Sequence, residues 1–272
     1  MFKQFIASLA LFVAFQASFA SELMQRPWNT RYAEFYPQIP YRLQTFKNIE
    51  SNHQNYRYNS HDSFVSPSIA LSVEHFSLEF ETELAKTRKR NFGLDHVSLT
   101  GRYQLTNDII GDFLSIIGGI KWIRAISKAV KDPASFHHGK TEFEFFLTFG
   151  KEFTVYNDWL NRWWGFTALG VADRGYPWLR GNLGWQFKHC QDHVFELYVK
   201  TLWGFGPKNF HLPHFKGYGH INHQSIDIGA AFEKRFDNEG TLRLEYGQRV
   251  FAKNFPKDTH QWIISYLYPF GL

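Results

Sequence analysis

Residues 76–84 read Phe-Ser-Leu-Glu-Phe-Glu-Thr-Glu-Leu, and residues 141–149 read Thr-Glu-Phe-Glu-Phe-Phe-Leu-Thr-Phe. In both stretches, large apolar side chains alternate with polar ones, several of which are glutamates. A period of two is the spacing of side chains that share one face of a β-strand. Each stretch therefore predicts a strand with one apolar face and one charged face.

The same alternation continues after residue 60 in segments of about ten residues that are separated by turn-forming residues. The further segments are 64–73, 95–105, 163–172, 178–189, 194–205, 225–236, 241–251 and 261–270. Residues 109–125 fit either a strand, through Ile116, Ile120 and Trp122, or a helix, through Phe113, Ile117 and Ile120. We prefer the strand, because the alternation of connection lengths requires a crossing element there.

The apolar faces are bulkier than the interior of a soluble sandwich about 10 Å thick can hold, so we expect them to face lipid. The polar faces carry charges of both signs, and charges enclosed within a narrow barrel must be paired. The charges predicted to line the lumen are Glu79, Glu81, Glu83, Arg102, Glu142, Glu144, Arg180, Lys188, Glu196, Lys200, Asp227, Glu233, Arg235, Arg243, Glu245 and Arg249. A soluble periplasmic β-protein remains an alternative, because its strands would alternate as well.

Connection lengths support a membrane barrel. Outer-membrane barrels join their strands by short periplasmic turns and longer outer loops. If the last strand ends in the periplasm, the long connections 126–140, 206–224 and 252–260 all fall outside. Aromatic residues at strand ends then gather near the periplasmic interface as a girdle, formed by Tyr103, Phe153, Trp163, Trp164, Phe236, Tyr268 and Phe270.

These patterns predict an all-β fold, a transmembrane antiparallel β-barrel of about twelve strands. About eleven strands are visible, and the missing one is expected in 41–50, where the alternation is faint. Residues 1–20 read as a signal peptide, with Lys3, an uncharged apolar stretch and cleavage after Ala20. Residues 21–40, with three prolines, are expected to form an extended periplasmic lead-in, which leaves 41–272 for the barrel.

The signal segment, the alternating strands and an aromatic terminal strand from His260 to Leu272 resemble the outer-membrane β-barrel class of Gram-negative bacteria. The resemblance implies a location in the outer membrane and contact with outer-membrane lipid. It also implies recognition by the barrel-assembly machinery during insertion, which in that class reads a C-terminal Phe. Here Phe270 is followed by Gly271 and Leu272, which departs from that pattern.

The sharpest candidate for chemistry is the stretch His223-Gln-Ser225-Ile-Asp227, which places a base, a hydroxyl and a carboxylate on one strand face. It is similar to the His-x-Ser segment of outer-membrane phospholipase A and of lipid A deacylases. In those families an Asn follows the Ser, whereas Ile226 stands here. An outer-membrane lipid hydrolase is therefore an alternative function, with enzymatic activity left open and judged the weaker interpretation.

The remaining composition excludes several classes. The net charge of +5 is too mild and too evenly spread for nucleic-acid binding, and the single cysteine excludes an internal disulfide framework. The chain has 13 histidines, several in the outer loops, but their spacing matches no standard zinc pattern. We therefore predict no metal and no cofactor, and interpret the loop histidines as solvated. The main expectation is a narrow or loop-gated pore for small solutes, or a structural surface protein.

Overall fold

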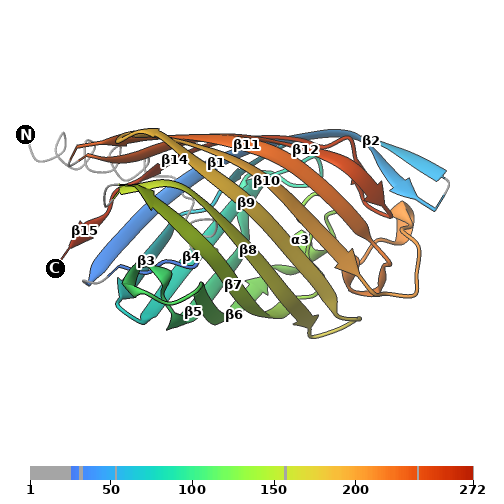
Figure 1. Cartoon of the computed structure of the whole chain (residues 1–272). Helices are drawn as coiled ribbons and strands as arrows, with labels where there is room; N and C mark the ends of the chain where they lie inside the picture. Colours follow the sequence, from blue (N-terminus) through green and yellow to red (C-terminus); the bar gives the residue numbers. More distant parts are fainter. Residues whose placement is uncertain (1–25, 31–32, 53, 156–157, 238, 272) are drawn as a thin grey trace, which may run out of the picture.

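The computed structural model describes residues 26–30, 33–52, 54–155, 158–237 and 239–271, and it is a single β-barrel (Figure 1). The predicted signal peptide, residues 1–20, lies outside these described residues. The sheet closes on itself as twelve antiparallel strands, which confirms the predicted fold class. In the described part of the chain, no helix combines the length and the apolar character needed to cross a membrane.

The elements follow one another along the chain with these bounds: β1 (Glu34–Ser51), β2 (Gln54–Val65), β3 (Ser68–Val73), β4 (Phe76–Lys86), β5 (Gly93–Thr106), η1 (Asp108–Ile110), β6 (Ser115–Ala125), α3 (Ser127–Val130), β7 (Thr141–Val155), β8 (Asp158–Ala172), β9 (Trp178–Cys190), β10 (His193–Gly204), η2 (Leu212–His214), η3 (Tyr218–His220), β11 (Gln224–Phe236), β12 (Gly240–Lys253), β13 (Pro256–Lys257), β14 (His260–Leu267) and β15 (Phe270–Gly271). Consecutive long strands pair in order, and β1 pairs with β14 to close the barrel.

The strand that sequence periodicity barely marks is β1, which covers 41–50 and begins earlier, at Glu34. It therefore includes Pro37 and Pro40 from the region expected to be a lead-in. Both β2 and β3 pair with β1, so they form one strand that is interrupted at residues 66–67. The interruption lies opposite residues 39–40, where Pro40 has no N–H to donate to a ladder. Residues 115–125 form β6, as preferred over the helix, while 108–110 form a single 3₁₀ turn.

Strand β10 shows the two faces of the wall. Phe195, Leu197 and Val199 point outward and are 39–56% exposed, whereas Glu196 is 3% exposed and faces inward. The neighbouring strands repeat this arrangement, as in Phe80 beside the buried Glu79 and Glu81 of β4. The exposed apolar surface is what a lipid-facing wall requires, and the enclosed charges are what a lumen requires.

The prediction of an outer aromatic girdle is wrong for one residue, Trp164. Trp164 is 3% exposed and lies inside the barrel, packed with Phe146, Phe166 and Ala168, whereas Trp163 contacts Phe149 on the outer face. In this part of β7 and β8 both faces are apolar, so hydrophobic periodicity does not determine which side is inward. The inward aromatic residues form a small core near the end of the barrel that carries the short turns.

The two ends of the barrel differ. One end, here called the turn end, carries connections 74–75, 107–114, 191–192 and 237–239, and β15 lies there (Figure 1). The other, here called the loop end, carries 87–92, 126–140, 173–177, 205–223 and 254–259. The two longest connections, 126–140 and 205–223, lie at the loop end as predicted, whereas 107–114 at the turn end is longer than 87–92, 173–177 and 254–259.

Candidate functional site: the barrel lumen

Ion pairs line the inner wall near the turn end. Arg243 of β12 lies 3.0 Å from Glu196, 2.5 Å from Glu233 and 2.9 Å from Glu245, and all four residues are at most 4% exposed. The carboxylates come from β10, β11 and β12, so this single guanidinium joins three adjacent strands along the inner wall. Buried charges of this kind are stable only when they are paired and hydrogen-bonded.

Residues 26–30, here called the N-terminal plug, enter this network. Arg26 is 4% exposed and forms ion pairs with Glu196, at 2.7 Å, and with Glu233. The Nη2 of Arg102 donates to the carbonyl oxygen of Arg26 at 2.7 Å. Arg26, which belongs to the predicted periplasmic lead-in, therefore lies inside the barrel and not beside it.

The wall is shaped to receive the plug. Trp28 packs against the inward aromatic core and donates from Nε1 to Asp108 Oδ1 at 3.0 Å. A Cβ on Gly150 would lie 2.8 Å from Pro27 Cγ and 3.2 Å from Trp28 Cη2, so a side chain there would collide with the plug. Because glycine lacks Cβ, the backbone of β7 and the plug can approach this closely.

A cavity of about 250 Å³ lies in the middle of the lumen. Its charged lining consists of Arg42, Glu81, Glu83, Arg180, Lys200, Asp227 and Arg249. Most of these charges are paired within the wall: Arg249 binds Asp227 through two nitrogens at 2.6 and 2.9 Å, and Arg42 lies 3.3 Å from Glu83. Charges of both signs thus face a space large enough for small solutes or water, beside apolar side chains such as Phe136 and Phe255.

An aromatic cluster closes the loop end above the cavity. Its buried members come from β1, β2 and three loops: Phe46, Ile49, Tyr58, Ala134, Phe210, Phe215, Tyr218, Ile221 and Phe255. Tyr218 Oη donates to the carbonyl oxygen of Pro133 at 2.9 Å, which ties loop 205–223 to loop 126–140. The long loops therefore fold inward over the lumen and bury apolar surface there.

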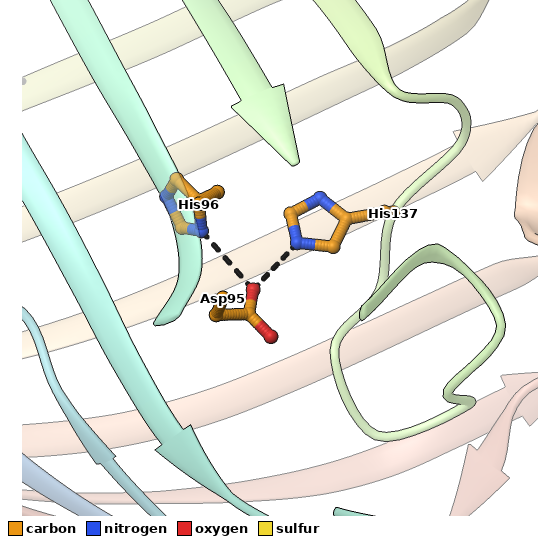
Figure 2. A group of neighbouring side chains, drawn as sticks. All are labelled: Asp95, His96 and His137. Carbon is orange, nitrogen blue, oxygen red and sulfur yellow. Dashed lines mark hydrogen bonds and ion pairs between the residues drawn. The ribbon is translucent and has the colours of Figure 1, made fainter. Parts of the chain in front are cut away.

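Histidines predicted to be solvated are largely inside this closure. His137, His138 and His223 are 5%, 5% and 0% exposed, which corrects that interpretation for these three, whereas His211, His214 and His220 are exposed. His137 Nε2 lies 2.6 Å from Asp95 Oδ2, and His96 Nδ1 lies 3.2 Å from the same oxygen (Figure 2). Burial lowers the pKa of His137, but its hydrogen bonds to Asp95 and Glu142 outweigh this and raise the pKa to about 10.

The three candidate catalytic residues do not form a hydrogen-bonded unit. His223 Nδ1 donates to the carbonyl oxygen of Ile221 at 3.0 Å, and its Nε2 lies 3.2 Å from His138 Nε2. Asp227 is engaged by Arg249, and Ser225 is 3% exposed on the inner face. Within the described residues, none of the three bonds to another, so the arrangement favours structural roles for His223 and Asp227 in place of nucleophilic catalysis.

The burial of His223 should make the stability of the folded protein depend on pH. Burial, together with the repulsion from His138 and Arg249, lowers its pKa to about 3 from an ordinary 6.5. Between pH 6.5 and 3 the unfolded chain protonates His223 more readily than the folded state does. The stability that neutral His223 contributes is therefore fully present above pH 6.5 and is lost as the pH falls towards 3. We expect His223→Gln to flatten the fall in urea-unfolding free energy between pH 6.5 and 4.5 by at most about 1.4 kcal/mol per pH unit. Equal slopes for both proteins would contradict this assignment.

All sixteen charges predicted to line the lumen are buried or half-buried. Several further inward charges escaped sequence reasoning, among them Arg26, Arg42, Arg162 and Lys121. Arg26 lies in a proline-rich stretch without alternation, and Arg162 lies in β8, where both faces are apolar. Lys121, which lies 3.3 Å from Glu81, could have been predicted to face the lumen, because it lies between the outward-facing Ile120 and Trp122 in the sequence.

No protein-family model and no curated protein sequence matches the chain. Solved structures do match in fold. An outer membrane channel from Pseudomonas putida F1 superposes with a TM-score of 0.60 at 11% identity, over 89% of this chain and 96% of that one. The KdgM porin in complex with oligogalacturonate gives 0.52 at 12% identity, over 86% and 99% of the two chains. The NanC porin gives 0.53 at 8% identity, over 87% and 98%.

At such low identity these matches establish the architecture and not the solute. They agree with what the strands show by themselves: a closed wall, an apolar outer surface and a charged interior. The chain has the fold of the outer-membrane β-barrel class, in the porin-like form shared with solved outer-membrane channels.

Proposed function

We propose that this protein is a narrow outer-membrane channel for small charged solutes, and that the structure represents its closed state. The single observation that carries the proposal is the central cavity, which is lined by charges of both signs and lies between two removable obstructions. One obstruction is the N-terminal plug at the turn end, and the other is the set of inward-folded loops at the loop end. The plug and loops 126–140 and 205–223 lie outside the strand ladder, so each can move without opening the wall.

The orientation follows from the same reasoning. Placing the turn end in the periplasm and the loop end outside matches the usual disposition of short turns and long loops. The outer face would then contact outer-membrane lipid, and insertion would use the barrel-assembly machinery. The signal peptide proposed for residues 1–20 would direct export.

Conductance is the primary test. Purified protein reconstituted in a planar bilayer should give discrete current steps that are small and rare, because both mouths are obstructed. The current steps should become more frequent when a substitution removes contacts that hold the loops or the plug in the lumen. A bilayer containing the correctly folded protein that stays silent at all voltages, with the plug variants silent as well, would identify a structural surface barrel and refute the channel.

The cavity charges should set selectivity. Arg42 faces the cavity and is half-buried, so Arg42→Glu would place an additional negative charge beside Glu81 and Glu83. We expect the reversal potential in a salt gradient to move towards that of cations. Arg57→Glu is the matched control, because Arg57 is exposed and lies outside the cavity lining. A shift of equal size in both variants would show that the cavity does not control ion passage.

A further inference from the structure

The cluster of Asp95, His96 and His137 lies beside the cavity, where His96 contacts the cavity residues Glu81 and Glu83. It joins the start of β5 to loop 126–140, as Figure 2 shows, with both imidazole rings directed at one carboxylate oxygen. One nitrogen from each ring and one carboxylate oxygen all lie within 4.8 Å of one another. Two imidazoles and a carboxylate are a common ligand set for zinc and related transition metals.

A β-bulge creates this arrangement. Glu83 pairs with His96 and Leu84 pairs with Leu94, so Asp95 is an additional residue in β5. Consecutive strand residues normally face opposite sides, yet Asp95 and His96 are both buried on the inner side, at 0% and 9% exposure. Bulges often re-aim a side chain at a functional site, and this bulge provides two potential ligands from adjacent positions.

The surroundings also match those of a metal site. The far nitrogen of His96, Nε2, lies 3.4 Å from Glu81, and the far nitrogen of His137, Nδ1, lies 3.5 Å from Glu142. Histidines that bind metals almost always direct their second ring nitrogen to such an acceptor, which fixes the tautomer and the ring orientation. Here two different carboxylates serve the two rings independently.

The carboxylate of Asp95 is oriented as well. Arg90 forms an ion pair with Oδ1, and the hydroxyl of Ser135 donates to the same oxygen at 2.8 Å. Oδ2 is left to the two imidazoles. One oxygen is thus anchored by a guanidinium and a hydroxyl, while the other faces the two nitrogens.

We propose that Asp95 Oδ2, His96 Nδ1 and His137 Nε2 bind one divalent transition-metal ion, with zinc as the ion that fits this donor set best. Binding displaces the ring protons on the two nitrogens that face Asp95, and these protons pass to solvent. The protons that face Glu81 and Glu142 stay in place. A doubly charged ion thereby replaces two protons, so the net charge of the buried cluster is conserved.

The bound ion would fasten loop 126–140 to the barrel wall. His137 belongs to that loop, which Tyr218 links to loop 205–223, so a metal bond here would stabilise the closure of the loop end. This consequence rests on the proposed channel function, whereas the metal site itself does not. The two can therefore be tested separately.

Zinc binding is measured on the full chain, folded in detergent and stripped with a chelator, by titration calorimetry and elemental analysis. We expect one zinc ion per chain, and His137→Ala should weaken binding at least about 100-fold. The control is His211→Ala with His214→Ala, a stacked pair outside the cluster, which should bind zinc as the native chain does. If His137→Ala fails to fold, Glu142→Gln provides the test, with an expected weakening of about 10–100-fold.

The outcomes separate the claims. No zinc binding by the native chain, or full binding by the folded His137→Ala or Glu142→Gln variant, would overturn the site. Loss of binding only in the His211 and His214 variant would place the metal on that pair. In bilayers, zinc should reduce the open probability of the native channel and leave His137→Ala unaffected. Zinc binding without this effect would keep the site and remove only its role in closure.

Discussion

Arg26→Ala should raise the single-channel conductance several-fold and make openings frequent. Arg26 is the only charged residue of the plug, and it holds residues 26–30 in the lumen through Glu196 and Glu233. Without it, the plug keeps the contacts of Trp28 but loses its ion pairs, so the turn end of the lumen should open. The two glutamates remain paired with Arg243, which protects the wall from collapse.

The measurement is single-channel recording with Arg57→Ala as the matched control, because Arg57 is exposed at the other end of the barrel. Trp28→Ala should act in the same direction by a second route, since it removes the packing against the inward aromatic core. If Arg26→Ala and Trp28→Ala both fold and both conduct as the native protein does, the plug does not obstruct the path.

Arg243→Ala should produce the largest loss of stability. It leaves the carboxylates of Glu196, Glu233 and Glu245 buried with too little positive charge, and breaking a buried pair in this way typically costs about 3–5 kcal/mol. The measurement is the free energy of unfolding in urea from lipid vesicles. Arg243→Lys should lose less, because an ammonium keeps the charge but cannot reach three partners at once.

Arg174→Ala is the control, since Arg174 is exposed in loop 173–177 and donates only to the carbonyl oxygen of Lys216. It should stay within about 0.5 kcal/mol of the native protein. Combining Arg243→Ala with Glu233→Gln should recover part of the loss, because one buried charge is removed. An Arg243→Ala protein as stable as the control would mean that this network contributes little to the stability of the wall.

The alternation of apolar and polar residues was sufficient to predict most of the wall, because one face of each strand meets lipid and the other faces the charged lumen. It places Glu196, Arg243 and Glu245 on the inner face, and all three are buried. It became ambiguous where both faces are apolar, as at Trp164, and where prolines weaken the pattern, as in the first part of β1.

The interior contacts were less accessible to sequence reasoning. The plug depends on Arg26 meeting carboxylates 170 and 207 residues away, and no local pattern encodes such a meeting. The histidine cluster depends on a bulge that turns Asp95 inward against its expected parity. His223 and Ser225 looked like a catalytic pair because they share a strand face, yet His138 from a distant loop is the nearer partner of the imidazole.

The central claim is that the apolar face of each strand meets lipid and the charged face meets the lumen. Nitroxide labels placed singly at residues 195–200 of β10, in protein reconstituted in vesicles, test it most directly. Collision with oxygen, which concentrates in lipid, should be high at 195, 197 and 199 and low at 196, 198 and 200. Uniform collision rates along the strand, or the opposite alternation, would contradict the barrel as described.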